Sequence, residues 1–327
     1  MMTSFALIFV VCGTIWGAMA LWFKSPAAGH LRLALPALWA MFALLAIIEA
    51  LNGNLYFVGA FAVAWVCMLL WWVCLVRPSN DRAWMPEVLH QTSGSRVGDV
   101  VRLHNVRDFK WMSSEVFEPR WVTRDYDLSK LESVDLVLSY WGRPAIAHAM
   151  VSFGFGENEY VVFSVEIRRK IGDKFSELGG FFRQYELAVL ASTEEDSLRV
   201  RTNVRGEDAY IYRVAMERGN ATALFLAYVD TANGLLTAPR FYNTLTANCT
   251  TLVFQLANRI VRGLPMDHRL LLSGYLPEYL FSIDALSGAD SVSEYRSKGR
   301  FTERAIASVT DGDFSRNIRR GVPGVDS

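Results

Sequence analysis

Cys249 is the residue whose type and surroundings most favour covalent chemistry. It directly follows Asn248, a good helix N-cap residue, and it opens a segment whose apolar stripe predicts an amphipathic helix over residues 249–262. In the first turn of a helix, unpaired backbone N–H groups and the positive end of the dipole stabilise a thiolate and lower the pKa of the thiol. The backbone N–H of Cys249 also lacks a helical acceptor, so it can donate to an oxyanion. A lone cysteine is more often a small buried apolar residue, but this position favours a nucleophile.

A thiolate nucleophile needs a base and a group that orients the base. His148 lies in a predicted strand over residues 146–155, and Glu166 lies in the next predicted strand, over residues 160–168. A histidine in such a strand can also be a core residue with one satisfied nitrogen. Glu166 is followed by basic residues and can also lie on a solvated face. The pairing of the two strands helps to decide between the catalytic and the structural alternative for each of these two residues.

The loop between these strands sets their register. If the loop has three or five residues, paired positions sum to 314 and His148 faces Glu166. A four-residue loop places Glu166 on the opposite face of the sheet. Gly154 and Gly156 favour a bulged loop with an odd number of residues. We therefore predict a contact between His148 and Glu166, with Ser164 as the second choice for orienting the base.

Side chains near the strands and the helix start provide further candidates. We expect Tyr140 or Asn248 to assist the Cys249 N–H in stabilising an oxyanion. The other three cysteines lie in apolar runs, so Cys249 has no partner for a disulfide or a cysteine-based metal site in the soluble part of the chain. The Gly154-Phe155-Gly156 stretch lacks the third glycine of a dinucleotide site. We therefore expect no metal and no cofactor.

Charge separates the chain into two parts. Of the 33 basic and 33 acidic residues, only three lie in residues 1–76: Lys24, Arg32 and Glu49. The same segment holds apolar runs over residues 5–23, 33–48 and 55–76. The outer two have the length that crosses a hydrocarbon core, and the charged side chains beside the short middle run can snorkel outward. We therefore predict three transmembrane helices. Separately, the balance of 33 basic and 33 acidic residues over the whole chain excludes a generic nucleic-acid-binding protein.

The membrane orientation has a weaker basis. The first run could be a cleaved signal peptide, because Ala18-Met19-Ala20 fits a cleavage site, but its start lacks a basic residue and two more apolar runs follow. Lys24 and Arg32 share the first loop, and the positive-inside tendency would place that loop and the soluble part in the cytoplasm. Two charges carry little weight in this rule.

The soluble part predicts an α+β domain. Predicted strands cover residues 97–103, 136–140, 146–155, 160–168, 198–202 and 209–214, and predicted helices cover 221–233 and 249–262. The alternation in the strands favours an antiparallel sheet with one buried face. We place a linker at residues 77–97, with Trp84 as a membrane anchor, and the domain at 98–287. Residues 288–327 predict a polar extension, of which about the last 15 residues are frayed.

Several stretches between about residues 98 and 280 resemble the bacterial periplasmic domain family named Lnb, after a lipoprotein N-acyltransferase. They are Asn105-Val106-Arg107-Asp108-Phe109, Tyr140-Trp141-Gly142, Ile146-Ala147-His148, Ser152-Phe153-Gly154-Phe155, Ser164-Val165-Glu166-Ile167-Arg168-Arg169, Gly180-Phe181-Phe182-Arg183-Gln184-Tyr185-Glu186-Leu187 and Asn248-Cys249-Thr250-Thr251. The strand histidine and the Asn-Cys helix start are also similar to circularly permuted NlpC-like, papain-like enzymes such as lecithin:retinol acyltransferase.

The resemblance implies Cys249 as the acyl-accepting nucleophile and His148 as its base, whereas Glu166 as the orienting group is inferred from the register. It also implies a periplasmic domain, which outweighs the two-charge argument, and an unpaired cysteine suits an oxidising compartment. In the lipoprotein acyltransferase this domain precedes the membrane helices, whereas here the helices come first. This difference leaves the substrate open.

Together these features predict a multi-pass cysteine acyltransferase of the bacterial inner membrane. It would move an acyl chain from a phospholipid to an amine, such as the N-terminus of a lipoprotein, through a thioester on Cys249. We expect Phe181, Phe182 and Arg183 to contact lipid, although packing of both rings in the domain core is an equal alternative. The alternative functions are a Cys/His hydrolase, that is a lipase, thioesterase or peptidoglycan amidase, and a non-catalytic envelope scaffold.

Overall fold

The computed structural model describes residues 2–24, 31–156, 158–308 and 311–325. The chain forms two compact units. The first contains Met1–Ser79 and Lys174–Glu186, and the second contains Asn80–Asp173 and Leu187–Ser327.

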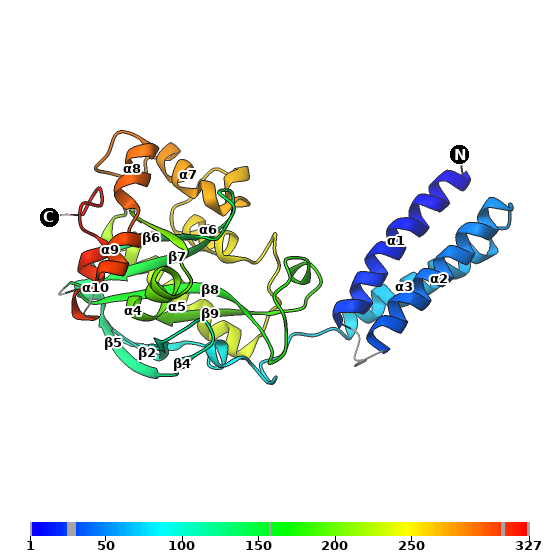
Figure 1. Ribbon diagram of the computed structural model, residues 1–327, viewed down its shortest axis with the longest axis horizontal. Helices are drawn as coiled ribbons and strands as arrows, with labels where there is room; N and C mark the ends of the chain where they lie inside the picture. Colours follow the sequence, from blue (N-terminus) through cyan, green and yellow to red (C-terminus); the bar gives the residue numbers. More distant parts are fainter. Residues whose placement is uncertain (1, 25–30, 157, 309–310, 326–327) are drawn as a thin grey trace. The chain divides into compact units, whose positions relative to one another are not determined.

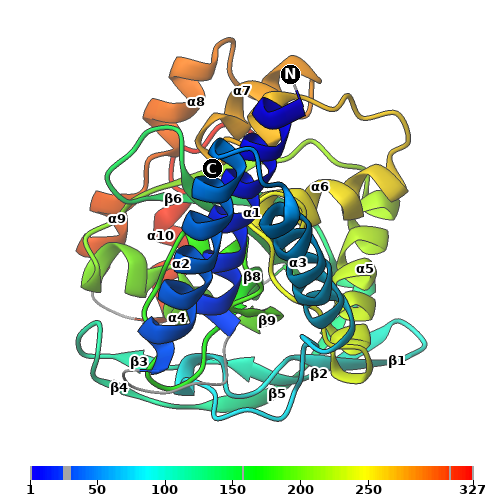
Figure 2. The same ribbon diagram turned by 90° about the vertical axis from the view of Figure 1, so that its right-hand side faces the viewer.

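The first unit contains three long apolar helices, α1 (Met2–Lys24), α2 (Leu31–Leu51) and α3 (Tyr56–Cys74), which lie side by side (Figure 2). Each is long and apolar enough to cross a membrane, as predicted, and α2 is longer than the apolar run that indicated it. Small residues allow α1 and α2 to approach closely, because a Cβ at Gly17 would lie 2.4 Å from Trp39 Nε1.

The second unit is built on one large sheet with the strand order β1-β2-β9-β8-β7-β6-β10, in which β5 also pairs with β2. The strands are β1 (Ser93–Val97), β2 (Val100–Arg107), β5 (Trp121–Asp127), β6 (Ser133–Tyr140), β7 (Ala147–Gly154), β8 (Tyr160–Arg168), β9 (Glu186–Ser192) and β10 (Asp208–Arg213). β3 (Lys110–Trp111) and β4 (Phe117–Glu118) form a separate hairpin. β2 and β9 are parallel, and the pairs β1–β2, β2–β5, β6–β7, β7–β8 and β6–β10 are antiparallel. The predicted α+β class is confirmed.

Helices cover both faces of this sheet. On one face, α5 (Arg218–Thr237) and α6 (Cys249–Ile260) pack on β7, β8 and β9, and α7 (Leu276–Ser282) and α8 (Val292–Gly299) pack on β6 and β10 (Figure 1). On the other face lie α9 (Thr302–Ala307) and α10 (Asp311–Ile318). Phe153, Phe163, Phe225 and Tyr228 are fully buried in the first core, and burial of a side chain of this size contributes roughly 2–3 kcal/mol.

The expectation of one buried face is wrong, because every residue of β7 and of β9 is buried. A strand that is buried on both faces shows a continuous apolar run instead of alternation, which is why β9 was not predicted. The strand predicted over 198–202 is also wrong. This segment forms the end of a helical stretch, with α4 (Glu194–Ser197) followed by the π-helix Val200–Val204.

Most of the expected linker belongs to the folded second unit. β1 pairs with β2, which places residues 93–97 in the sheet. Trp84 is buried rather than a membrane anchor. The Arg168 guanidinium lies 4.3 Å from the centre of its ring, and its Nε1 donates to the Asn80 carbonyl at 2.9 Å.

The described end of the chain, residues 311–325, also packs into the core, in contrast to the frayed end that was expected. Phe314 and Ile318 are fully buried. The buried Arg319 guanidinium donates to Asp135 Oδ2 at 2.9 Å and to Glu194 Oε1 at 2.6 Å. A polar sequence is compatible with burial here because the cation and the two carboxylates pair with one another.

Candidate active site

The register of β7 and β8 determines which side chains meet. Met150 lies opposite Ser164, so paired positions sum to 314, as predicted from the glycine-containing loop. The same register brings His148 opposite Glu166, and His148 Nε2 lies 3.1 Å from Glu166 Oε1. Ser164 faces Met150 instead of the histidine.

The hydrogen-bonded pairing of β7 and β8 stops before it reaches His148 and Glu166, which leaves an opening between the two strands. The start of α6 lies at this opening. Ladder pairing ends at Met150. Ala147 donates its N–H to Ser273 Oγ at 2.8 Å, and its carbonyl accepts from the same hydroxyl at 2.6 Å. Backbone groups of alternate residues point to the same side of a strand, so the Ala149 N–H points into the opening as well. It donates to the Cys249 sulfur.

Local sequence fixes the position of Cys249 in the first turn of α6. Asn248 Oδ1 accepts from the N–H groups of Thr250 (2.9 Å) and Thr251 (2.8 Å), and Thr251 Oγ1 accepts from the Asn248 N–H (3.0 Å), which completes a capping box. The Asn248 amide nitrogen donates to the Thr244 carbonyl at 2.6 Å. The side chain of Asn248 thus holds the helix start, whereas the Cys249 N–H has no acceptor within the described residues.

The thiol and the imidazole are neighbours. The Cys249 side chain hydrogen-bonds to His148 and lies 3.9 Å from Thr250 Oγ1. Cys249 is half-buried, whereas His148 is only 9% exposed. The structure therefore brings the three predicted catalytic side chains into one contiguous row, with Cys249 and Glu166 half-buried at its two ends and His148 buried between them.

Charge interactions favour an ion pair in this row. Burial lowers the pKa of His148, and so does Arg201, but the Glu166 carboxylate and the hydrogen bonds to Cys249 and Glu166 outweigh them and raise it to about 9. Burial opposes ionisation of Cys249, yet the hydrogen bond and charge of His148, with the Ala149 N–H, lower the pKa of the thiol. Burial would also raise the pKa of Glu166, but His148 and Arg201 hold it well below its usual range. The two shifts reinforce each other, because a protonated imidazole favours the thiolate and a thiolate favours the imidazolium.

A second layer of buried polar groups holds Glu166. Arg201 Nη2 lies 3.8 Å from Glu166 Oε1, and Arg201 Nη1 lies 3.1 Å from Glu207 Oε2. Ser139 Oγ donates to the same Glu207 oxygen at 2.5 Å. Ser139 is also the β6 partner of His148 in the ladder. The contacts therefore run from His148 through Glu166, Arg201 and Glu207 to Ser139, which lies beside His148 in the neighbouring strand.

Sequence reasoning did not identify Arg201 or Glu207. Arg201 lies in the π-helix Val200–Val204, and an insertion of this kind often marks a functional site. The segment reads as a short strand, and no spacing within it points to Glu166. Only the folded chain shows this contact.

Residues 117–274 match a family model described as Lnb N-terminal periplasmic domain. This segment belongs to the Lnb-type periplasmic domain family. It contains His148, Glu166 and Cys249. No curated protein and no solved structure matches the chain. With its three apolar helices, the chain is a membrane protein with a periplasmic domain, which overrides the charge argument for a cytoplasmic one.

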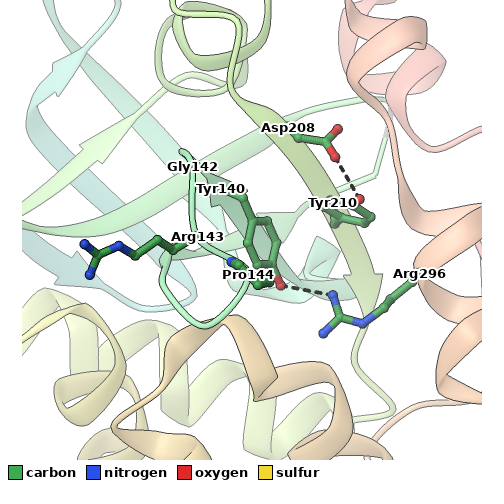
Figure 3. Close-up of a pocket in the computed structure, with 7 residues that line it drawn as sticks. All are labelled: Tyr140, Gly142, Arg143, Pro144, Asp208, Tyr210 and Arg296. Carbon is green, nitrogen blue, oxygen red and sulfur yellow. Dashed lines mark hydrogen bonds between the residues drawn. The ribbon is translucent and has the colours of Figure 1, made fainter.

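Tyr140 of the Lnb-type domain has partners outside the row of three side chains. Its hydroxyl donates to the Gly274 carbonyl at 2.8 Å and accepts from Arg296 Nη1 at 3.3 Å. Together with Asp208 and Tyr210 it lines a cavity of about 290 Å³ (Figure 3). Among the expected oxyanion donors, the Cys249 N–H is the one without an acceptor in the described structure. Within the same described residues, no cluster of His, Cys, Asp and Glu could hold a metal ion.

Phe181, Phe182 and Arg183, which were expected to contact lipid, lie in the first unit, and their surroundings differ from one another. The Phe182 ring stacks on Phe23 of α1 with centroids 5.7 Å apart, and it makes an edge contact with Trp72 of α3 at 6.3 Å. Arg183 Nη1 donates to the Trp72 carbonyl at 2.6 Å. Phe181 is 41% exposed. Phe182 and Arg183 thus bind the apolar helices, and Phe181 is the ring that faces outward.

Proposed function

We propose that this chain is a membrane-anchored cysteine acyltransferase. The observation that supports it is the row of Cys249, His148 and Glu166, in which a thiol in the first turn of a helix lies beside a strand-borne imidazole whose pKa the carboxylate raises. The arrangement is also consistent with the permuted papain-like order of these groups. A thiolate of this kind is activated for attack on an ester carbonyl without a metal ligand of its own.

In the first step, the Cys249 sulfur forms a bond to the carbonyl carbon of a phospholipid ester. The Cys249 N–H donates to the oxyanion of the tetrahedral intermediate. As the carbon–oxygen bond breaks, the His148 imidazolium gives its proton to the departing lysophospholipid alkoxide. A thioester on Cys249 and a neutral imidazole remain. Glu166 keeps the ring oriented and stabilises it whenever it is protonated.

In the second step, an amine attacks the thioester. His148 takes the proton of the amine, the amide bond forms, and the thiolate leaves, which restores the ion pair. An acceptor that is itself anchored in the membrane, such as the N-terminus of a lipoprotein, would reach the site at a high effective concentration. We place the protein in the bacterial inner membrane as a multi-pass protein. Three crossings that end in a periplasmic domain require a cytoplasmic N-terminus.

The proposal can be tested on the full chain in detergent with a phospholipid of defined acyl chains. Intact-mass measurement should show one acyl adduct on the wild type and none on Cys249→Ser or His148→Ala. Cys67→Ser and His104→Ala are matched controls, because Cys67 lies in α3 and His104 is exposed on β2. A lipopeptide with a free amino terminus should then remove the adduct and gain the same mass.

Two other results would replace the proposal. Release of free fatty acid at the same rate with and without the amine would assign a hydrolase, since water can attack the same thioester. If no phospholipid gives an adduct and Cys249→Ala supports full activity in cells, the chain would be a scaffold with a structural cysteine.

A further inference from the structure

The segment Lys174–Glu186, which connects β8 to β9, is an internally braced loop. The Tyr185 hydroxyl donates to the Lys174 carbonyl at 2.9 Å and accepts from the Ser176 N–H at 2.7 Å, which ties the two ends together. The Gln184 N–H donates to the Gly179 carbonyl at 3.0 Å. The Gln184 side chain packs tightly on Gly179, where a Cβ would lie 1.8 Å from Gln184 Oε1. The loop therefore holds its own shape.

Three large apolar side chains of this loop are exposed. Bonds from residue i to residue i+3 join Ser176 to Gly179, Leu178 to Phe181 and Gly179 to Phe182. In successive turns of this type, side chains three residues apart lie above one another. Leu178 and Phe181 have this spacing within the turns, and Phe175 directly precedes the first turn. Phe175, Leu178 and Phe181 are 58%, 55% and 41% exposed.

The loop is attached to the ends of α1 and α3. Phe182 stacks on Phe23 in the last turn of α1. Arg183 donates to the Trp72 and Val76 carbonyls at the end of α3, at 2.6 and 3.3 Å, and its guanidinium lies 4.9 Å from the centre of the Trp72 ring. α1, α2 and α3 follow one another along the chain, so in a membrane α1 and α3 cross in the same direction and α2 crosses in the opposite one. The C-terminal ends of α1 and α3 are therefore on the same side of the membrane. Helix ends lie where hydrocarbon meets the headgroups.

We propose that Phe175, Leu178 and Phe181 insert into the lipid layer on the periplasmic side and give the Lnb-type domain a second attachment to the membrane. Lipid acyl chains are the partner, because these side chains are apolar and their loop is attached to helices that already lie in hydrocarbon. Contiguous apolar side chains on an ordered loop mark an interaction surface rather than a surface exposed to water. This inference does not depend on the chemistry of Cys249.

The test uses the full chain with Cys12, Cys67, Cys74 and Cys249 changed to Ser and a single Leu178→Cys labelled with an environment-sensitive fluorophore. The protein is reconstituted into vesicles of phosphatidylethanolamine and phosphatidylglycerol, with and without lipid that carries a doxyl group near the head of its acyl chain. We expect blue-shifted emission that doxyl lipid quenches. A Phe175→Cys label provides a second position in case one substitution disturbs the loop.

The same label at Val97→Cys, a residue that is 81% exposed in β1, is the matched control and should be neither shifted nor quenched. If the labels at positions 175 and 178 emit as in water and resist quenching, the loop does not enter lipid and the inference is wrong. Because the labelled chain lacks Cys249, this result is independent of any failure of the acyltransferase proposal.

Discussion

Replacing Glu166 with Gln should lower the pKa of His148 by about 2–3 units. The substitution removes a charge that lies 3.1 Å from Nε2 but keeps the size of the side chain. At an effective dielectric constant of about 20, two unit charges at this distance attract each other by about 5 kcal/mol. The pKa of His148 is raised from 6.5 to about 9, a net effect of about 3 kcal/mol after burial and Arg201 have acted against it. Without the carboxylate, burial and Arg201 still lower the pKa and the hydrogen bond to Cys249 alone raises it, so the pKa should fall to about its ordinary value.

The thiol should respond in the opposite direction. The ion pair exists between the lowered pKa of Cys249 and the raised pKa of His148. In Glu166→Gln the imidazole is neutral at pH 7.5, so the sulfur loses its cationic neighbour and its pKa rises. We expect alkylation of Cys249 at this pH to slow roughly tenfold, because only a small fraction of an ordinary thiol is ionised there.

The assay needs no substrate. In a chain with Cys12, Cys67 and Cys74 changed to Ser, the rate of alkylation by iodoacetamide is followed by intact mass as a function of pH. Glu115→Gln is the matched control, since Glu115 is an exposed carboxylate with no role in the site. If Glu166→Gln has the same pH profile as the wild type, the carboxylate does not set the charge of the histidine, and the electrostatic account of the site is wrong.

Three further predictions concern stability and are read from thermal or urea unfolding. Asn248→Ala removes a capping box and should cost about 1 kcal/mol, with slower thiol alkylation because the first helical turn loosens. Arg319→Met leaves two buried carboxylates without their shared cation and should cost about 3–5 kcal/mol, whereas the exposed neighbour Arg320→Met should have little effect. The raised pKa of His148 adds stability that is complete below pH 6.5 and is lost as the pH rises through about 9, so this loss should be absent in Glu166→Gln.

The parts of the fold that depend on local rules were predictable from the sequence. The glycine-containing loop between β7 and β8 gave the correct register, and Asn248 gave the first residue of α6. β9 could not be found this way, since burial on both faces removes the alternation that identifies a strand. The end of the chain was expected to be frayed because the sequence turns polar after Ala285, yet Arg319 is buried. Its burial depends on Asp135 and Glu194, which lie far away in the sequence.

The contacts of the site also fall into two groups, those that local strand pairing predicts and those that only the folded chain brings about. His148 and Glu166 are near in sequence, and one strand pairing relates them. Arg201 reaches Glu166 from a π-helix, and Tyr140 bonds to Gly274 across the domain, so neither contact leaves a local pattern. Long-range contacts of this type decide which of several candidate polar groups remain available for chemistry.

The opening between β7 and β8 is as important to the proposed chemistry as the three side chains. If the ladder continued past Met150, the Ala149 N–H would pair with β8 and could not donate to the Cys249 sulfur. An open strand edge leaves backbone groups unpaired, which is costly in a buried place. The Ser273 hydroxyl accepts from the Ala147 N–H and donates to its carbonyl, so it replaces the β8 partner that Ala147 lacks. A thiolate placed there gains a strand N–H and a helix dipole together, and neither element supplies both alone.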